Sequence, residues 1–390
     1  MKIAFFSNFL NHHQLPLCQA FLAKAEVEFV FVATEPIAKE RLTMGYEDMN
    51  AYPFVLRAYE SEAEAKKAVY IAETYDVVIF GATPLTYLQK RMDKNLLSFR
   101  FCERSLKKGT WRRFIPRTRR KIHEGYIRYK NKKLYVLGAS AYTAHDLILC
   151  GFDKAKCFKW GYFPEIKDRD VKALLKKKEQ NQKTEILYAG RLLKLKRVID
   201  SLKAIRLLVK QGTKNIHFTV IGEGEEKARL QAYVEKHDLG EYVSFLPFMS
   251  PEDVRTYMDK ADVYIFGSNF YEGWGAVVNE AMNSACALLV SHAVGSAAYL
   301  IKNGENGFIY PCGNVKELAK KLRMVVEDPA LRHRLGEGAY RTVKGLWSAQ
   351  TAADCLLTLS ESIEHTPESP WEDGPGSSAE NIKNDWIKKK

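Results

Sequence analysis

The sequence predicts an α/β protein with two doubly wound domains. Short apolar strands alternate with amphipathic helices along most of the 390 residues, as in parallel sheets covered by helices. The alternation stops at a charged stretch, residues 167–183, and restarts after it. A chain of this length holds one to three domains, and the interruption favours two.

The first domain is expected to span residues 1–166. Helices are predicted at His12–Lys24 and Ser61–Thr74, with other helical stretches between the later strands. The segment Val27–Ala33 is apolar at nearly every position, which indicates a sheet buried on both faces. The predicted strands are Ile3–Phe6, Val27–Ala33, Pro53–Leu56, Asp76–Phe80, Asn95–Phe101, Lys133–Leu137 and Cys157–Trp160.

After a linker at residues 167–183, the second domain is expected at residues 184–345. Its predicted strands are Glu185–Tyr188, His217–Ile221, Tyr242–Leu246, Asp262–Phe266 and Cys286–Val290. Its predicted helices are Arg197–Lys210, Glu225–His237, Pro251–Ala261 and Val315–Val326. A closing helix is predicted within residues 346–365. A flexible tail follows at 366–390, where Pro, Gly and Ser cluster with charges.

The composition limits the classes of protein and partner. No apolar run approaches the roughly 18 residues that span a bilayer, and the start of the chain is too polar for a secretory leader. Seven scattered cysteines predict a reduced, cytoplasmic protein. The formal charge is +13, and residues 100–133 alone hold fourteen Lys and Arg against Glu103 and Glu124. Such a patch attracts phosphate-rich partners.

The stretch Phe270–Met282 carries the strongest signal for a site. Glu272 and Glu280 stand eight residues apart, in an order of strand, glycine-rich turn and helix. Between them lie Gly273, Trp274 and Gly275. Glycines let a ligand approach the backbone, helix N-termini attract anions, and carboxylates accept from sugar hydroxyls. We expect a site for a phosphorylated sugar; the alternative is a surface turn in which Glu272 satisfies the helix dipole.

Two more loops follow buried strands of the second domain. Arg191 and Lys196 are placed to clamp a diphosphate and stabilise it as a leaving group, unless their loop is simply exposed and basic. Gly222 and Gly224 also follow a strand and open a helix. They allow the close approach of a nucleotide or, alternatively, form an ordinary tight turn.

In the first domain, candidate acceptor or phosphate contacts follow the strands. Asn8, His12 and His13 come after the first strand, and their alternative is a set of polar residues at a helix start. Glu103 could orient an acceptor hydroxyl or act as a base, and Arg104 lies beside it. The alternative for Glu103 is an ion pair with neighbouring cations. The D-x-D at residues 168–170 lies in the linker and is read as a chance match, so no metal is expected.

Five segments of the second half together resemble a known family. They are YAGRLLKLKRVIDSLKAI, VIGEGEEKARL, VSFLPFMSPEDVRTYM, ADVYIFGSNFYEGWGAVVNEAM and VSHAVGSAAYLIKNGENGFIYPCGN. Their order is similar to the donor-binding domain of GT-B-fold glycosyltransferases, specifically the retaining family four. In the first half, NFLNHHQLPL, FRFCERSLKKG and FKWGYFPE look like a bacterial branch associated with surface-polysaccharide assembly.

The resemblance implies two Rossmann-like domains facing across a cleft. It implies transfer of a sugar from a nucleotide-sugar, expected to be a UDP-sugar, to a glycan or polyprenyl-linked acceptor, with retention and without metal or cofactor. Arg191 and Lys196 would hold the diphosphate, Glu280 the ribose and Glu272 the transferred sugar. The backbone of residues 273–275 would touch phosphate or sugar. Many members carry a glycine-rich loop where this chain has Asn-His-His, and a histidine near Glu103.

Other functions and partners remain open at this level. A non-catalytic nucleotide-sugar-binding scaffold and a sugar-nucleotide epimerase of the same fold are the alternatives. The basic segment with interleaved aromatics suits an anionic membrane surface, which predicts a cytoplasmic protein peripheral to the inner face of the plasma membrane; the alternative is a solvated basic face. No helix-turn-helix, zinc or RNP-like signature supports nucleic-acid binding. The sequence specifies neither the sugar, the base, the acceptor nor the oligomeric state.

Overall fold

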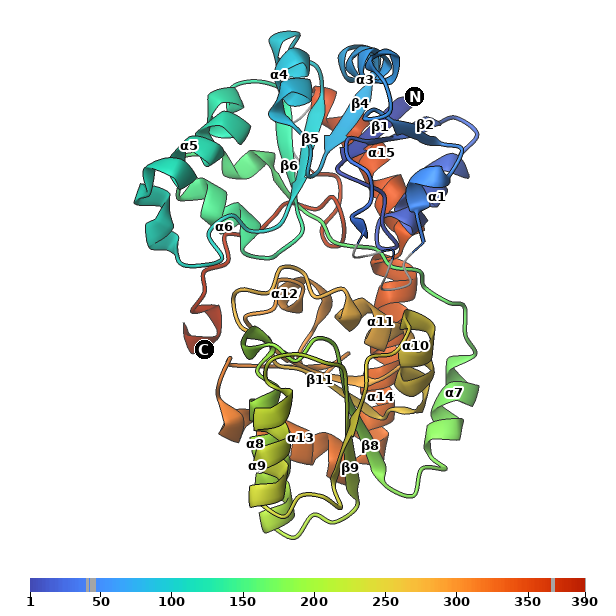
Figure 1. Ribbon diagram of the computed structural model, residues 1–390, viewed down its shortest axis with the longest axis vertical. Coiled ribbons are helices and arrows are strands. Elements are labelled where there is room, and N and C mark those ends of the chain that lie inside the picture. Colours follow the sequence, from blue (N-terminus) through green and yellow to red (C-terminus); the bar gives the residue numbers. More distant parts are fainter. Residues whose placement is uncertain (40–41, 43–46, 366–368, 390) are drawn as a thin grey trace. The chain divides into compact units, whose positions relative to one another are not determined.

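The computed structural model describes residues 1–39, 42, 47–365 and 369–389, and it divides into two compact α/β units (Figure 1). Unit 1 comprises Met1–Glu165 with Trp347–Asn384, and unit 2 comprises Ile166–Leu346 with Asp385–Lys390. Each unit is built on one parallel sheet. The predicted α/β class with two parallel-sheet domains is therefore confirmed. No helix among these described residues is long and apolar enough to cross a bilayer.

The sheet of unit 1 has seven strands in the order β3-β2-β1-β4-β5-β6-β7. The strand order reverses between β1 and β4, which makes this edge the topological switch point of the sheet. The predicted strands of the first half are confirmed with small shifts of their ends. The strands are β1 (Lys2–Ser7), β2 (Glu28–Ala33), β3 (Val55–Arg57), β4 (Val77–Phe80), β5 (Ser98–Cys102), β6 (Leu134–Gly138) and β7 (Cys157–Lys159).

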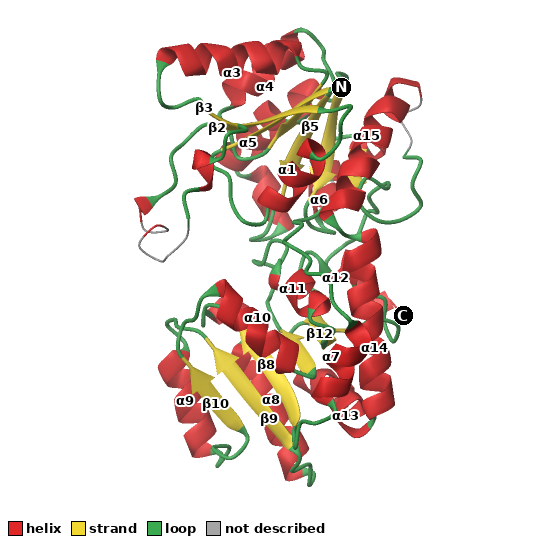
Figure 2. Ribbon diagram, turned by 90° about the vertical axis from the view of Figure 1, so that its right-hand side faces the viewer, coloured by secondary structure: helices red, strands yellow, loops and turns green. Residues whose placement is uncertain are grey.

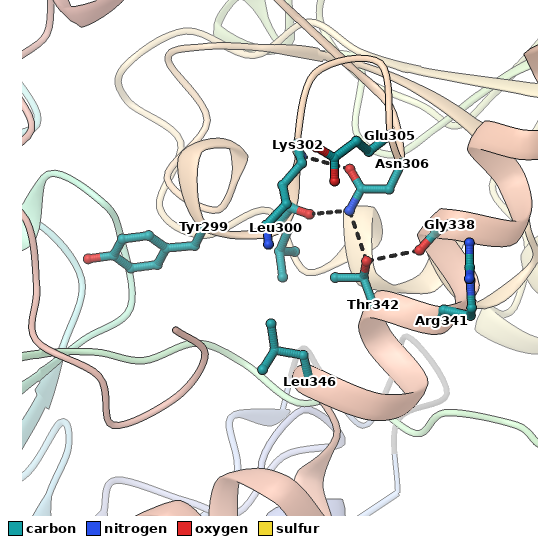
Figure 3. A pocket seen from close by; sticks show the side chains of 9 residues that line it. All are labelled: Tyr299, Leu300, Lys302, Glu305, Asn306, Gly338, Arg341, Thr342 and Leu346. Atoms are coloured by element: carbon teal, nitrogen blue, oxygen red, sulfur yellow. Dashed lines mark hydrogen bonds between the residues drawn. The ribbon is translucent and has the colours of Figure 1, made fainter. Parts of the chain in front are cut away.

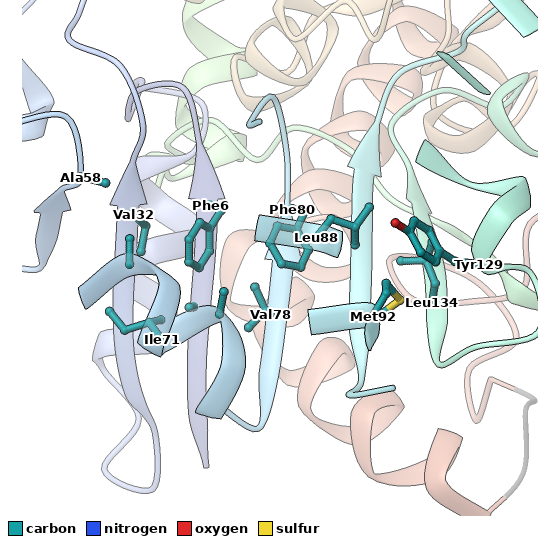
Figure 4. Packing of buried hydrophobic residues seen from close by; sticks show 13 residues of the cluster. Phe6, Val32, Ala58, Ile71, Val78, Phe80, Leu88, Met92, Tyr129 and Leu134 are labelled. Atoms are coloured by element: carbon teal, nitrogen blue, oxygen red, sulfur yellow. The ribbon is translucent and has the colours of Figure 1, made fainter. Parts of the chain in front are cut away.

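Helices cover both faces of this sheet. On one face, α3 and α4 bury apolar side chains against alternate positions of the strands, as Figure 4 shows for Ile71, Leu88 and Phe80. Figure 2 shows α3 and α4 together, and α1 packs against α15 elsewhere in the unit. The helices are α1 (Leu15–Leu22), α3 (Glu62–Thr74), α4 (Leu85–Asp93), α5 (Pro116–Gly125), α6 (Thr143–Ile148) and α15 (Ala349–His365).

Local chemistry sets the helix starts of unit 1. Ser61 caps α3 by accepting from the Glu64 backbone N–H at 3.1 Å, which satisfies one of the unpaired donors of the first turn. Helix α1 is shorter than the predicted His12–Lys24. The Asn11 side chain holds a turn before it, accepting from the His13 N–H at 3.0 Å.

The sheet of unit 2 has six strands in the order β10-β9-β8-β11-β12-β13, so its switch point lies between β8 and β11. The predicted strands of the second half are confirmed, but β13 was not predicted. It is a short segment preceded by Gly307 at φ +158°. The strands are β8 (Thr184–Ala189), β9 (Ile216–Ile221), β10 (Val243–Leu246), β11 (Val263–Phe266), β12 (Ala287–Ser291) and β13 (Phe308–Tyr310).

Helices of unit 2 pack against one another around its sheet. Helix α8 packs against α9 and α13, and α10 packs against α7 and α11. Helix α14 was not predicted, although Asp328 caps it and a proline stands in its first turn. The helices are α7 (Val171–Lys178), α8 (Val198–Lys210), α9 (Lys227–Lys236), α10 (Pro251–Lys260), α11 (Val277–Asn283), α12 (Ala297–Leu300), α13 (Val315–Glu327) and α14 (Pro329–Arg341).

The stretch predicted as a linker, residues 167–183, instead contains helix α7 and belongs to unit 2. Lys178 at the end of α7 is buried. Its ammonium donates to the carbonyls of Ala261 and Ser284, both at 2.6 Å. These hydrogen bonds offset the free-energy cost of burying the Lys178 ammonium. The charged composition of this stretch had indicated that the ammonium would lie in solvent.

The C-terminal segment, predicted to be flexible, packs on unit 1 over residues 373–381. Ser378 forms an antiparallel bridge with Phe158 of the edge strand β7. The Lys159 N–H donates to the Ser377 carbonyl at 2.7 Å, and the Ala379 N–H donates to the Cys157 carbonyl at 2.8 Å. The edge of the sheet is therefore paired by the chain's own tail.

Candidate functional site

The loops at the switch point of unit 2 follow β8 and β11, the two strands where the order reverses. The β8 loop holds a 3-10 turn, η5 (Lys194–Lys196), and the β11 loop runs to the start of α11. The Asn269 N–H donates to the Leu195 carbonyl at 2.9 Å and so ties the two loops together. Ligands of doubly wound sheets bind outside the carboxyl ends of strands at this point.

Lys196 and Glu272 meet across these loops. The Lys196 ammonium lies 2.5 Å from a carboxylate oxygen of Glu272, and the two side chains are only 15% and 14% exposed. The same ammonium lies 5.0 Å from the ring centroid of Phe266. The structure thus brings together two residues that the sequence assigned to one site. A cation and a carboxylate at a strand end can hold a phosphate and a hydroxyl of one ligand.

Gly222 and Gly224 lie against the β8 loop. A Cβ on Gly222 would be 2.2 Å from the Gly190 carbonyl oxygen, and a Cβ on Gly224 would be 2.4 Å from that of Leu192. The Leu192 N–H donates to the Glu223 carbonyl at 2.7 Å. These glycines therefore let the backbone after β9 pack directly against the backbone after β8, in line with the tight-turn alternative. This packing holds in place the loop that carries Lys196.

Arg191 stands on the same loop with an exposed side chain. Its carbonyl accepts from the Tyr188 hydroxyl at 3.1 Å. Burial raises the pKa of Tyr188; the negative charge of Glu272 adds to this effect, and the positive charge of Arg191 opposes it. Both charges therefore act on one buried hydroxyl at the end of β8.

Trp274 is a core residue. It is 1% exposed, and its indole N–H donates to the Asn279 side-chain oxygen at 2.9 Å. Gly275 beside it has φ +81°, and a Cβ there would be 2.7 Å from the Phe266 ring. The Trp274 side chain is engaged in the interior. The predicted contact of residues 273–275 with a ligand would therefore be made by their backbone.

Glu280 lies on α11 with a side chain 18% exposed, 3.7 Å from an Arg255 guanidinium nitrogen. Burial raises the pKa of Glu280, and the Arg255 charge opposes that shift. Arg255 also donates to the Glu280 carbonyl at 3.4 Å. Sequence spacing does not indicate this partner, because Arg255 lies 25 residues upstream on another helix, α10.

In unit 1, Asn8, His12 and His13 follow β1, at the switch point of that sheet. The rings of His12 and His13 have centroids 3.8 Å apart, and His13 lies 5.9 Å from the Tyr162 ring. Asn8 accepts from the Ser7 hydroxyl at 3.2 Å. The two histidine rings therefore lie together, and the contact of Asn8, His12 and His13 with an acceptor remains a prediction.

Glu103 follows β5 and forms an ion pair with Lys107. The Tyr162 hydroxyl also bonds to Glu103; burial first, and then this carboxylate, raises the pKa of Tyr162. The ion-pair alternative for Glu103 is thus present in the structure. A role for the Glu103 carboxylate as the base that acts on the acceptor hydroxyl stays a prediction.

Arg104 has a structural setting, and its contact with an acceptor stays a prediction. Its guanidinium is buried and donates to both carboxylate oxygens of Asp146, at 2.9 and 3.2 Å. It also donates to Asn384 of the tail at 3.0 Å and lies 4.8 Å from the Tyr142 ring centroid. The planar guanidinium can donate two hydrogen bonds to one carboxylate, which explains why this position suits Arg.

The two carboxylates of the D-x-D at residues 168–170 make structural contacts. Asp168 accepts from the Tyr340 hydroxyl at 3.2 Å and pairs with Lys344 at 3.2 Å. Asp170 caps α7, accepting from the Ala173 N–H at 3.0 Å. Within the part of the chain that the structure describes, no three His, Cys, Asp or Glu form a cluster that could hold a metal ion.

A cavity of about 300 Å³ opens elsewhere in unit 2, between the end of α12 and α14 (Figure 3). Asn306 spans part of its wall, donating to the Leu300 carbonyl and to the Thr342 hydroxyl, both at 2.9 Å. None of the predicted site residues lines it. The lining residues are Tyr299, Leu300, Lys302, Glu305, Asn306, Gly338, Arg341, Thr342 and Leu346.

A protein-family model matches a range of residues within unit 2. Residues 170–342 match the family model described as glycosyl transferases group 1. The matched range contains Arg191, Lys196, Glu272 and Glu280. The resemblance seen in the sequence is thereby confirmed at the level of this family, while membership of family four and retention of configuration stay predictions.

Two curated relatives each align with about half of the chain. Alpha-D-kanosaminyltransferase of Streptomyces kanamyceticus is 27% identical over 203 residues, covering 51% of this chain and 52% of the relative. An alpha-1,4-N-acetyl-D-galactosaminyltransferase of Campylobacter jejuni, whose name specifies a glycan on PP-undecaprenol, is 30% identical over 176 residues. That alignment covers 45% of this chain and 48% of the relative. The chain thus spans about half the length of these relatives.

Solved structures resemble the whole fold. The Anabaena HepE protein in complex with UDP superposes with a TM-score of 0.66 at 17% identity, covering 93% of this chain and all of HepE. The likeness establishes the fold and confirms the predicted GT-B class.

Proposed function

We propose, from the match of residues 170–342 to the glycosyl transferases group 1 model, that the protein is a glycosyltransferase of bacterial polysaccharide biosynthesis. It moves a sugar from a nucleotide-sugar to a glycan or polyprenyl-linked acceptor. The names of the curated relatives, one of which specifies PP-undecaprenol, support this class of donor and acceptor. The fold shared with HepE, solved with UDP, supports a uridine diphosphate donor.

The observation that carries the proposal is the pairing of Lys196 with Glu272 at the switch point of unit 2. Lys196 and the exposed Arg191 hold the diphosphate, and Glu272 accepts from hydroxyls of the transferred sugar. Glu280, in the first turn of α11, accepts from the ribose. Glu103, Asn8, His12 and His13 are the proposed contacts on the acceptor side.

The proposed reaction needs no resident cofactor and no metal ion. The bond between the sugar C1 and the diphosphate oxygen breaks, and a bond forms between C1 and the acceptor hydroxyl oxygen. The hydroxyl proton passes to the departing diphosphate. Lys196 and Arg191 stabilise the negative charge that develops on the leaving group, a type of contribution worth roughly 3–4 kcal/mol per preorganised donor. The alpha linkages in the relatives' names support retention from an alpha-linked donor.

The test is a screen of nucleotide-sugars for thermal stabilisation, followed by nucleotide release in the presence of lipid-linked glycan acceptors. The double substitution Arg191→Ala with Lys196→Ala should abolish both signals. The matched control is Lys203→Ala with Arg206→Ala on α8, which removes the same charge from unit 2 away from the switch point. Undiminished release in the first variant would refute the clamp.

The same assay separates the other functions. A scaffold would be stabilised by the nucleotide-sugar and release no nucleotide with any acceptor. An epimerase would convert the donor without an acceptor. Only a transferase couples nucleotide release to a product that carries the sugar.

A further inference from the structure

One segment of unit 1 combines dense positive charge with outward-facing aromatic rings. Residues 108–121, here called the basic surface, hold seven Lys and Arg and no acidic residue. They form the 3-10 turn η2 (Thr110–Phe114) and most of α5. Figure 1 shows α5 at the side of unit 1 away from α1. Arg117, Arg119 and Lys121 on α5 are exposed, whereas Ile122 anchors the helix to the core.

The aromatic side chains of this surface point into solvent. Trp111 is 60% exposed and Phe114 is 71% exposed, whereas large apolar side chains are mostly buried in proteins. The two residues are three apart on η2, and side chains at this spacing in a 3-10 helix lie on one face. Gly109, at φ +116°, makes room for the indole, because a Cβ there would be 2.7 Å from Trp111.

An arginine lies over each ring. The Arg113 guanidinium lies 4.4 Å from the Phe114 centroid, and that of Arg112 lies 5.7 Å from the Trp111 centroid. Both aromatic residues stay more than half exposed with these cations beside them. This arrangement suits a layer in which apolar groups sit just below a plane of negative charge.

We infer that the basic surface docks on a membrane that contains anionic phospholipid, with Trp111 and Phe114 inserted at the interface. Seven cations within fourteen residues match the charge of anionic headgroups, to which each Lys or Arg adds roughly fivefold in binding. Each arginine occupies one of the two ring faces on which nucleic-acid bases would stack, whereas insertion into lipid leaves these cations at the headgroups.

This inference goes beyond the proposed function and does not depend on it. Docking requires no donor, no acceptor and no residue of unit 2. Under the proposed function, it would hold the acceptor-side unit where polyprenyl-linked glycans lie.

The experiment is sedimentation of the full chain with two kinds of vesicle. One contains phosphatidylcholine alone, and the other contains phosphatidylcholine with phosphatidylglycerol. We expect binding to the anionic vesicles only. The triple substitution Arg117→Gln, Arg119→Gln and Lys121→Gln should weaken it about 100-fold. The matched control, Lys172→Gln with Lys176→Gln and Lys177→Gln on α7, should bind as the parent does.

The apolar contribution is tested separately. Trp111→Ala with Phe114→Ala should weaken binding at least tenfold, whereas Phe248→Ala, an exposed aromatic of unit 2, should leave it unchanged. The tryptophan emission should shift to the blue on anionic vesicles, and Trp111→Phe should remove that shift while retaining binding. Thermal unfolding of each variant verifies that it is folded.

Three outcomes would overturn the inference. They are equal binding to both kinds of vesicle, parent-like binding by the triple variant, and tighter binding to a duplex or single-stranded oligonucleotide than to anionic vesicles. Loss of nucleotide release in the Arg191 and Lys196 variant leaves vesicle binding untouched, so failure of the proposed function and failure of docking are distinguishable.

Discussion

The Lys196 ammonium lies 2.5 Å from a carboxylate oxygen of Glu272, although the two residues are 76 positions apart in the chain. Their meeting follows from the strand order, because β8 and β11 are neighbours only where the sheet reverses direction. In the proposed function, a diphosphate would compete with Glu272 for Lys196. The carboxylate would then be released toward the hydroxyls of the sugar.

Removing the cation should slow turnover far more than it alters the fold. We predict that Lys196→Ala lowers nucleotide release by roughly 10²–10³, the usual cost of losing one preorganised contact to developing charge. Lys194→Ala, an exposed cation of the same turn, is the control and should retain most of the activity. An equal loss in both variants would mean that general positive charge, and not the Lys196 position, matters.

The stability contributed by Glu280 should depend on pH. Burial raises its pKa above the ordinary 4.5, so the native state holds this proton at pH values where the unfolded chain has lost it. The resulting stabilisation is fully present below pH 4.5 and is lost as pH rises through the native pKa. The Glu280→Gln variant cannot ionise at this position, so it does not lose stability in this way as the pH rises.

The free energy of unfolding of Glu280→Gln relative to the parent should therefore increase from pH 4.5 towards neutrality and then level off. Each tenfold difference in proton affinity is worth about 1.4 kcal/mol. Urea unfolding across this range measures the trend, and Glu235→Gln serves as the exposed control. A difference that does not change with pH would contradict the assignment.

Adding one methyl group at Gly222 should destabilise unit 2. Gly222 has φ +136°, and the new Cβ would collide with the Gly190 carbonyl oxygen at 2.2 Å. We predict that Gly222→Ala lowers the free energy of unfolding by about 3 kcal/mol, measured in urea. Gly240→Ala, where a Cβ meets no atom within 4 Å, should stay within about 0.5 kcal/mol of the parent.

Arg104 should behave as a structural residue. Arg104→Gln leaves the buried Asp146 carboxylate without its main counter-charge, which should cost about 3–5 kcal/mol of stability. Lys108→Gln, an exposed neighbour, is the control. If Arg104→Gln instead raised the KM for the acceptor and left the thermal unfolding midpoint unchanged, the acceptor contact predicted from the sequence would be correct.

Much of the fold could be predicted because buried parallel strands leave a plain signal. Runs such as DVVIF and DVYIF are apolar throughout, and their alternation with helices fixes the class. The meeting of Lys196 with Glu272 was predictable on the same ground, while their roles toward a ligand stay predictions. Lys196 and Glu272 each follow such a run, and the carboxyl ends of parallel strands share one edge of a sheet.

The failures came where long-range contacts override composition. Residues 167–183 are charged, yet Lys178 is buried. Carbonyls just after α10 and α11 accept hydrogen bonds from its ammonium. The neighbourhood of Arg104 shows the same effect, since Asp146 and Asn384 lie 42 and 280 residues away. The backbone freedom of Gly222 is visible in the sequence, whereas the Gly190 carbonyl that packs against it is not.

The bridge between Phe158 and Ser378 has a consequence for solubility. Strand β7 ends its sheet, and an uncovered terminal strand offers its amides and carbonyls to any other chain. Here residues 376–379 already occupy them, so the last segment acts as a built-in guard against self-association. Cutting the chain after Ile363 should therefore produce material that aggregates on concentration, even though both sheets would remain complete.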